Sequence, residues 1–318
     1  MKYSATHINN IMQVISICIV TALLTGCASL SSPQVEKKSE YSGLGDPNAE
    51  LAYNTAFPVV SVEEAVARGD EAMMRGDLDR ALFEYLRALD KKGADGELLY
   101  KVGQIHLARK DMSKAELSFV LVLKEESGHA GALTELGRIQ MQRRDYAGAR
   151  KLLLMAREIV PNSARIFNSL GVLEDMTKNH QQAQDYFARA IELNRNNPLY
   201  RNNMGYSRYL IGDQAGAEQA FIETLRLDPG YERAWRNLAL VYAKTGRFNE
   251  ALDAFGKVEE EHQALNDVGY VAMLSGRYAD ADHYFNEAIR QAPMYYELAN
   301  RNIKQLDLVR DKEDNPGK

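Results

Sequence analysis

Five glycines of this chain lie 34 residues apart, and this spacing constrains the fold more than any other feature. They are Gly69, Gly103, Gly137, Gly171 and Gly205. Glycine makes up about 7% of ordinary sequences, so the chance of such a series is about 1 in 2,000. A fixed period of this length indicates a stack of similar structural units, each of which contacts its neighbours.

Two further series of residues keep the same phase. An alanine follows each glycine by twelve residues, at Ala81, Ala115, Ala149, Ala183 and Ala217. The small residues continue through Ala239, Ala251, Gly269 and Ala281. Four residues past each alanine stands a large apolar residue, at Tyr85, Phe119, Leu153, Phe187, Phe221, Phe255 and Phe285. Small residues let two helices approach closely, and we expect the large ones to fill the space toward the next helix pair.

The segment 231–258 shows what one unit contains. Trp235, Leu238 and Tyr242 fall on one helical stripe. Gly246 stands where a helix commonly ends. The residues after it are again spaced as on a helix, at Ala251, Leu252, Ala254, Phe255 and Val258. Each unit is therefore predicted to be a helix, a turn and a second helix.

This order of small and aromatic residues resembles the tetratricopeptide repeat. Seven units can be counted between residues 62 and 294, and three second helices are expected to end at prolines, namely Pro161, Pro229 and Pro293. The resemblance implies an all-α fold, a right-handed α-solenoid of about seven helix-turn-helix repeats over residues 61–294. The alternative is a generic helical bundle, which has no reason to keep a fixed period.

The period lapses once, between Ala239 and Gly269, where the spacing falls to 30 residues. The four missing residues are about one helical turn. They are missing around 259–261, so the second helix of the sixth unit is expected to be short, with a local change of superhelix geometry.

The last part of the chain, residues 295–318, is predicted to be a capping helix and a charged tail. Apolar residues at helical spacing continue over 294–309. A solenoid needs a terminal element to cover its last apolar face. From Arg310 onward the residues are mostly charged, and we expect them to be frayed.

Residues 1–26 have the pattern of a lipoprotein signal peptide. Lys2 precedes an apolar stretch of about 15 residues, which is too short for a comfortable membrane span. The stretch ends at Leu24-Thr25-Gly26-Cys27, which resembles a bacterial lipobox. The resemblance implies that the Cys27 thiol receives a diacylglyceryl group and becomes the mature N-terminus, anchored by its acyl chains. The alternatives are an uncleaved anchor and an ordinary secretory signal with an incidental cysteine.

The residues after Cys27 favour the periplasmic face of the outer membrane. An aspartate directly after the lipidated cysteine would resemble the inner-membrane retention signal of enteric bacteria. This chain has Ala28 at that position, followed by Ser29. Cys18 lies in the segment predicted to be removed, so no disulfide can form in the mature chain. Residues 27–60 show no periodicity and are predicted to be a flexible tether.

No motif in the sequence predicts catalysis. The net charge is −5, with 39 basic and 44 acidic residues interspersed, which argues against nucleic acid as a main partner. Phosphate loops, dinucleotide fingerprints and nucleophile elbows do not occur. Glu259 and His262 form one Glu-x-x-His, whereas a di-iron site needs two. We expect no catalytic residue, no metal, no cofactor and no small-molecule substrate.

The first helices carry the candidate partner-binding groove. By the register of the family, positions on their exposed face carry amides, at Asn168, Asn202, Asn203, Asn237 and Asn266. These amides either bond the backbone of an extended peptide or cap and solvate locally. One turn along lie apolar residues, at Tyr206, Tyr209, Leu210, Leu240, Tyr270, Met273 and Leu274. These residues either form a protein-binding site or pack against the neighbouring hairpin.

The whole layout resembles the TadD type of lipoprotein from tight-adherence (Flp) pilus systems. The resemblance is carried by 168–173, 202–207, 236–240 and 266–270, together with the shortened junction. It implies an outer-membrane adaptor whose protein partners are a secretin or pilus assembly components. One alternative is a pilotin-like lipoprotein of a type IV pilus. That resemblance implies six repeat units in a shorter chain, whereas seven are counted here. Another is an accessory subunit of an envelope polysaccharide or cell-wall enzyme.

Overall fold

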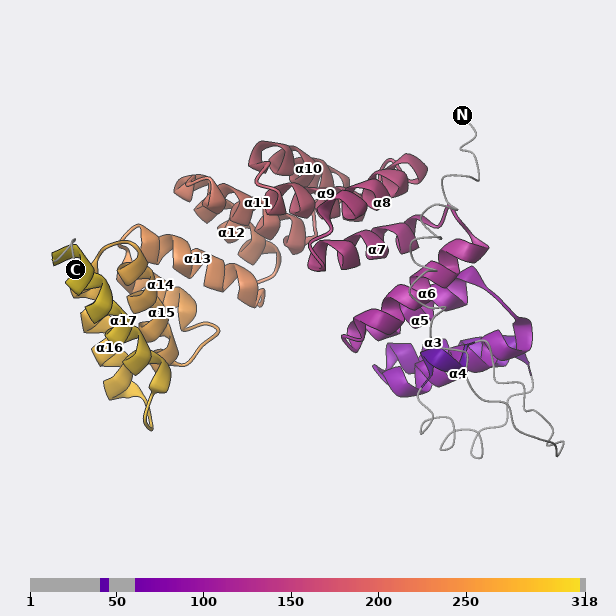
Figure 1. Cartoon of the computed structure of the whole chain (residues 1–318), viewed down its shortest axis with the longest axis horizontal. Helices are drawn as coiled ribbons and strands as arrows, with labels where there is room; N and C mark the ends of the chain where they lie inside the picture. The colour runs from indigo at the N-terminus through magenta and orange to yellow at the C-terminus, as the bar shows by residue number, and fades with distance from the viewer. Residues whose placement is uncertain (1–40, 46–60, 315–318) are drawn as a thin grey trace, which may run out of the picture. The chain divides into compact units, whose positions relative to one another are not determined.

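The computed structural model describes residues 41–45 and 61–314 (Figure 1). The described residues form α-helices and one short 3-10 helix, η2 (Ser42–Leu44), without strands. This confirms the predicted all-α class. The predicted signal peptide, the lipidation site Cys27 and most of the predicted tether lie outside the described residues.

The described helices fall into two compact units, divided between residues 159 and 160. The first unit contains α3 (Val62–Met74), α4 (Leu78–Lys92), α5 (Gly96–Ala108), α6 (Met112–Glu125), α7 (Ala130–Gln142) and α8 (Tyr146–Ile159). The second contains α9 (Ala164–Met176), α10 (His180–Leu193), α11 (Pro198–Leu210), α12 (Gln214–Leu227), α13 (Glu232–Lys244), α14 (Phe248–Phe255), α15 (Glu261–Leu274), α16 (Tyr278–Gln291) and α17 (Glu297–Asp314). The helices from α3 to α16 form seven consecutive pairs, as the period predicts.

The helix ends follow local chemistry. Four second helices begin at an aspartate whose carboxylate accepts a backbone N–H one turn later, at Asp77, Asp111, Asp145 and Asp213. The prolines confirm the predicted stops, because α8, α12 and α16 each end two residues before one.

The turn inside each pair contains one residue with a left-handed backbone, seven residues past the periodic small residue. Glycine fills it in four pairs, at Gly76, Gly212, Gly246 and Gly276. In the other three pairs the residue is Lys110, Arg144 or Lys178, with φ between 62° and 65°. The left-handed backbone conformation of these three residues costs an L-residue about 1–2 kcal/mol.

Each periodic glycine lies against the large residue of the second helix in its own pair. A Cβ placed on Gly103 would lie 2.5 Å from Cε1 of Phe119, and one on Gly137 would lie 2.9 Å from Cγ of Leu153. Both distances are below any normal carbon contact, so only glycine fits. The sequence had suggested that these large residues fill the space toward the next pair, whereas their nearest role is to join the two helices of one pair.

The lapse in the period falls where predicted. Helix α14 has 8 residues, whereas α12 and α16 have 14 each. Ala243 of α13 and Ala272 of α15, on either side of α14 in the sequence, belong to one buried cluster. The accompanying change of superhelix geometry stays a prediction.

The capping helix α17 extends further than the sequence suggested. It continues to Asp314, five residues beyond the expected end at 309, so residues 310–314 are helical rather than frayed. Its buried residues include Asn302 and Leu306. The Arg310 guanidinium donates to the backbone oxygen of Tyr278 at 2.6 Å, which ties the last turns to α16.

Part of the predicted tether packs against the first unit. Tyr41 and Leu44 are buried, the latter with 1% of its surface exposed. The Lys114 ammonium donates to the backbone oxygen of Gly45 at 3.1 Å. The backbone of Leu44 lies beside the buried His106 imidazole, and burial lowers the pKa of this histidine to about 4. The expectation of a flexible tether is therefore wrong for residues 41–45, since two large apolar side chains are removed from water there.

Candidate partner-binding surface

The predicted amides of the second unit bond to one another between consecutive first helices. Asn203 of α11 donates to Asn168 of α9, with 2.8 Å between Nδ2 and Oδ1. Asn237 of α13 donates to Asn202 of α11 across 3.0 Å. Because Asn202 also lies 3.5 Å from Asn203, the four side chains form one continuous row, which we call the amide row.

The last helices repeat this arrangement. Asn302 of α17 donates to Asn266 of α15 across 2.9 Å, and Asn266 donates to Asp267 across 3.0 Å. Asn168, Asn202 and Asn266 are all buried. The expectation that these amides are exposed to a peptide is therefore wrong for all three, because their side chains form hydrogen bonds between packed helices.

In the sixth pair a charged residue takes one of the two amide positions. Arg236 stands at the position in its repeat that Asn202 holds in the previous repeat. Its Nε donates to the Glu259 carboxylate at 2.8 Å. The Arg236 guanidinium also lies 3.5 Å from Glu232. Burial raises the pKa of the Asp267 carboxyl, Glu259 raises it further, and Asn266 and Arg236 oppose both. Glu259 thus serves as an ion-pair partner, and His262 contacts Glu260 and the ring of Tyr296.

The apolar residues divide into exposed and buried members. Tyr206 is 43% exposed and its ring stacks on Tyr209, with 6.3 Å between centroids. The Lys244 ammonium lies 4.6 Å from the centroid of Tyr209. Burial raises the pKa of the half-buried Tyr209. Together these residues present an aromatic surface with a cation beside it.

A second exposed pair lies on α15. Tyr270 is 39% and Leu274 67% exposed. Leu240 of α13 is half-buried against the core, and Met273 is a buried member of that core. The predicted exposure of Met273 is thus wrong, since it lies four residues past Gly269 on the side that packs inward. What remains accessible is Tyr206, Leu210, Tyr270 and Leu274, which we call the apolar surface.

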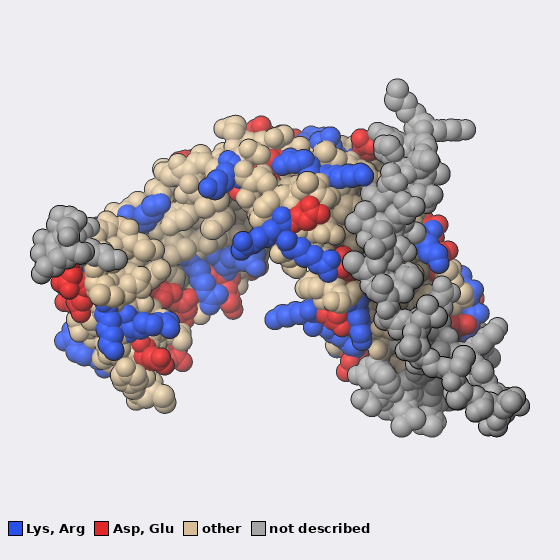
Figure 2. All heavy atoms as spheres, in the orientation of Figure 1, with Lys and Arg blue, Asp and Glu red and all other residues tan. Residues whose placement is uncertain are grey.

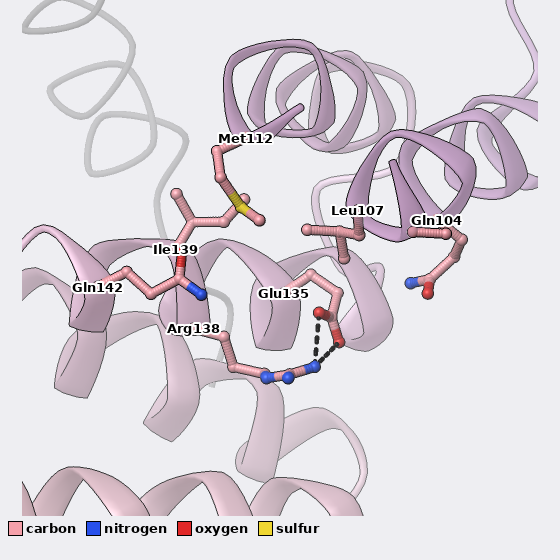
Figure 3. A pocket seen from close by; sticks show the side chains of 8 residues that line it. Gln104, Leu107, Met112, Glu135, Arg138, Ile139 and Gln142 are labelled. Atoms are coloured by element: carbon pink, nitrogen blue, oxygen red, sulfur yellow. Dashed lines mark hydrogen bonds and ion pairs between the residues drawn. The ribbon is translucent and has the colours of Figure 1, made fainter. Parts of the chain in front are cut away.

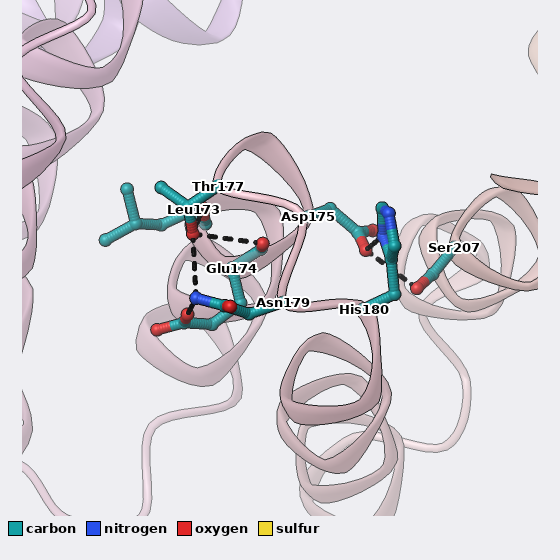
Figure 4. A network of polar contacts seen from close by, with 7 residues as sticks. All are labelled: Leu173, Glu174, Asp175, Thr177, Asn179, His180 and Ser207. Carbon is teal, nitrogen blue, oxygen red and sulfur yellow. Dashed lines mark hydrogen bonds and ion pairs between the residues drawn. The ribbon is translucent and has the colours of Figure 1, made fainter. Parts of the chain in front are cut away.

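A polar network that sequence reasoning missed joins α9, α10 and α11 (Figure 4). The Asp175 carboxylate accepts hydrogen bonds from Ser207 Oγ at 2.8 Å and from His180 Nδ1 at 2.9 Å. Burial raises the pKa of Asp175, and its two partners offset part of that rise. One turn away, Asn179 Nδ2 donates to the buried Glu174 carboxylate at 2.9 Å. No sequence motif signals this network, because its members come from three helices.

The visible face of each unit carries both basic and acidic side chains, separated by areas of other residues (Figure 2). Among the described residues, no three histidine, cysteine, aspartate or glutamate side chains gather as metal ligands would. Over the same residues, no helix combines the length and apolarity that crossing a membrane requires.

A model of the tetratricopeptide repeat matches residues 66–130, 134–198 and 202–261, which is more than half of the chain. The chain belongs to the tetratricopeptide repeat family. The tetratricopeptide match begins in α3 and ends at the start of α15. No curated protein sequence matches the chain.

Several solved structures share this tetratricopeptide fold. PilW, described as a widely conserved type IV pilus biogenesis factor, is 20% identical over 65% of this chain and 98% of its own, with a TM-score of 0.55. PilF of Pseudomonas aeruginosa is 18% identical over 66% of this chain and 96% of its own, with a TM-score of 0.52. A tetratricopeptide repeat protein from Parabacteroides merdae is 18% identical over 77% and 96%, with a TM-score of 0.54. At these identities the likeness concerns the fold alone.

Tetratricopeptide repeats are scaffolds for protein–protein contact, and the second unit suits that use. The amide row joins neighbouring first helices to each other with partly buried hydrogen bonds. The apolar surface is then presented by packed helices rather than by loops. Large exposed aromatic side chains on a rigid support are typical of protein-binding sites.

Proposed function

We propose that this protein is an outer-membrane lipoprotein adaptor that binds protein partners through the apolar surface of its second unit, in the assembly of a tight-adherence (Flp) pilus or secretion apparatus. One observation carries the proposal. Tyr206 of α11 and Tyr270 of α15 are both exposed, whereas Tyr200 and Met204 of α11 and Val268 and Met273 of α15 are buried. Water-exposed aromatic groups on packed helices gain free energy when a partner covers them.

The membrane part of the proposal rests on the sequence. The run Leu24-Thr25-Gly26-Cys27 would place a lipid anchor on Cys27, and the absence of aspartate after it favours the outer membrane. A partner-binding scaffold held there would face the periplasm, where secretin subunits and pilus components assemble. The TadD-like motifs between 168 and 270 favour the Flp system.

The second candidate is a pilotin-like role in type IV pilus assembly. The fold likeness to PilW and PilF supports a repeat scaffold of the same kind. This chain differs from the shorter layout expected of a pilotin in two respects. It has seven helix pairs, and 32 residues separate Cys27 from residue 60. A subunit of a cell-wall or polysaccharide enzyme is the third candidate.

Crosslinking in intact cells separates the three. The lipoprotein is purified after crosslinking and its partners are identified by mass spectrometry. Flp pilus components, with or without their secretin, support the first candidate. A secretin without Flp partners supports the second, and glycan synthases would overturn both.

The anchor is tested separately. Cells are fed an alkyne analogue of palmitate, and the label on the protein is compared between the parent and Cys27→Ser. We expect label and outer-membrane fractionation for the parent, with both lost in the variant. Cys18→Ser is the matched control and should keep both. An unlabelled parent would contradict the proposed anchor.

A further inference from the structure

Residues 41–45, which we call the strap, pack on the first unit although they lie outside the repeats. A bond from the Leu44 N–H to the Tyr41 backbone oxygen, at 2.9 Å, closes the short 3-10 turn of the strap. Tyr41 and Leu44 are buried, whereas Gly43 between them is exposed. The strap contacts α6, where the Lys114 ammonium donates to the Gly45 oxygen at 3.1 Å. Two buried apolar side chains and one hydrogen bond therefore hold the strap in place.

The imidazole of His106, on α5, lies beside the strap. The backbone of Leu44 is its neighbour there, and only 1% of the histidine surface is exposed. Neither ring nitrogen has a hydrogen-bond partner among the described residues. A buried imidazole without partners stays neutral, because a proton would place an unpaired charge in an apolar site.

The place of His106 in its repeat does not by itself require burial. In the third and fifth pairs the same position holds Gln140 and Arg208, which are both partly exposed. In the fourth pair the position holds Glu174, which is buried, but Asn179 donates to its carboxylate at 2.9 Å. Among the described elements, the strap is an addition to the second pair. We therefore attribute the burial of His106 to the strap.

The charges around the imidazole also oppose its protonation. Burial is the main reason that the pKa of His106 falls to about 4, and the Lys114 ammonium of α6 lowers it as well. Arg109, directly after α5, acts in the same direction more weakly. Asp111, at the start of α6, and the Leu44 backbone favour the charged form without outweighing these effects. The strap itself contains no charged side chain.

We propose that the strap is an acid-sensitive device, docked on the first unit at neutral pH and released more often in mild acid, when His106 takes up a proton and Leu44 leaves the imidazole. Release would lengthen the connection to the membrane. The sequence places 13 residues between Cys27 and Tyr41 but 33 between Cys27 and Ser61, which precedes α3. Such segments span at most about 45 Å and about 115 Å. Only this consequence for reach rests on the proposed anchor at Cys27.

The test follows the strap and the imidazole separately on the purified full-length protein. Hydrogen exchange of peptides that contain residues 41–45, corrected for intrinsic rates, reports how often the strap opens. Proton NMR reports the titration of His106. Docking is favoured above pH 6.5 and weakens as the pH falls toward 4. The protection of the strap should therefore fall by up to about twentyfold from pH 7 to pH 5.

Three variants separate the causes. Leu44→Ala removes an apolar contact of the strap, so it should lower protection at both pH values and move the His106 titration toward 6.5, with helicity by circular dichroism unchanged. Gly43→Ala is the matched control in the same turn, because a Cβ there meets nothing within 4 Å, and it should behave like the parent. His106→Leu cannot take up a proton, so its strap should be equally protected at both pH values.

The proposal is overturned if His106 titrates alike in the parent and in Leu44→Ala, since the helices alone would then bury the imidazole. Equal protection of the parent strap at pH 5 and pH 7 also overturns it, as does a fall in His106→Leu that matches the parent. These measurements need neither a lipid nor a partner. Labelled Cys27 and crosslinked pilus components with an acid-insensitive strap contradict the strap proposal alone. An acid-sensitive strap without such label and crosslinks contradicts the proposed function alone.

Discussion

The side-chain amide of Asn237 donates to the amide oxygen of Asn202 across 3.0 Å, which links the first helices of two consecutive repeats. Asn202 is almost completely buried, so its oxygen has no access to water as a substitute donor. The bond therefore acts as a structural joint between α11 and α13. It also explains why the amides do not serve as open groups for a peptide.

Replacing Asn202 with alanine should lower stability. The change leaves the Asn237 donor without its acceptor and opens a small buried space, at a cost of about 1–3 kcal/mol. The midpoint of urea unfolding measures the loss. Asn249→Ala changes an exposed asparagine of α14 and should leave the midpoint unchanged. Equal midpoints for parent and Asn202→Ala would show that the bond contributes nothing.

Gly171→Ala should destabilise the fourth pair. The new Cβ would lie 2.5 Å from Cε1 of Phe187, which is fully buried and cannot move aside. Overpacking of this kind costs about 1–3 kcal/mol. Gly128→Ala is the control, because a Cβ there meets nothing within 4 Å. Urea unfolding of both variants separates a steric cost from the general effect of adding a methyl group.

Lys178→Gly should stabilise the protein. Lys178 has a φ of 65°, a conformation that glycine adopts freely, whereas the equivalent residues of four other pairs are already glycine. A gain of about 1 kcal/mol is expected in urea unfolding. Lys178→Ala removes the same charge but keeps the strained backbone, so it should give no such gain. A matching gain in the alanine variant would mean that charge, rather than backbone strain, is responsible.

Stability should fall in mild acid because of His106. Burial lowers its pKa to about 4 from 6.5, so the unfolded chain binds a proton more readily than the folded one. The contribution is fully present above pH 6.5 and is lost as the pH falls toward 4, by about 3 kcal/mol in all. Urea midpoints at several pH values, compared between the parent and His106→Leu, measure it. The leucine variant should lose part of this pH dependence, and identical slopes would contradict the buried neutral histidine.

The sequence predicted the fold well because its strongest signals are local. The glycine at position 171 and the large residue at position 187 both belong to one helix pair, and such pairs recur at a fixed spacing. The short α14 followed from four missing residues. The docking of Leu44 beside His106 could not be predicted, since it joins residues 62 positions apart outside the period.

The candidate site was predicted less completely. The repeat pattern in the sequence identified which residues lie on the first helices. It could not distinguish Tyr270, which is exposed, from Met273, which is buried. That difference depends on how neighbouring helices approach one another. The same holds for Asp175, whose two partners come from α10 and α11. A hollow of about 350 Å³ that is lined by residues of α5, α6 and α7 likewise depends on side chains of three helices (Figure 3).

The double change Tyr206→Ala with Tyr270→Ala should abolish capture of the partner while the helices stay intact. Both residues are about two fifths exposed, so their removal also takes away some packing and should cost about 1–3 kcal/mol of stability without unfolding the helices. At an interface, by contrast, aromatic anchors of this kind are typically worth 2 kcal/mol or more each, about 30-fold or more in affinity. Crosslinking in cells followed by mass spectrometry measures capture, and circular dichroism measures helicity. Replacing the exposed Met294 and Tyr295, which lie in the loop before α17, is the matched control and should leave capture intact. Undiminished capture by the helical double variant would exclude the apolar surface as the site of partner binding.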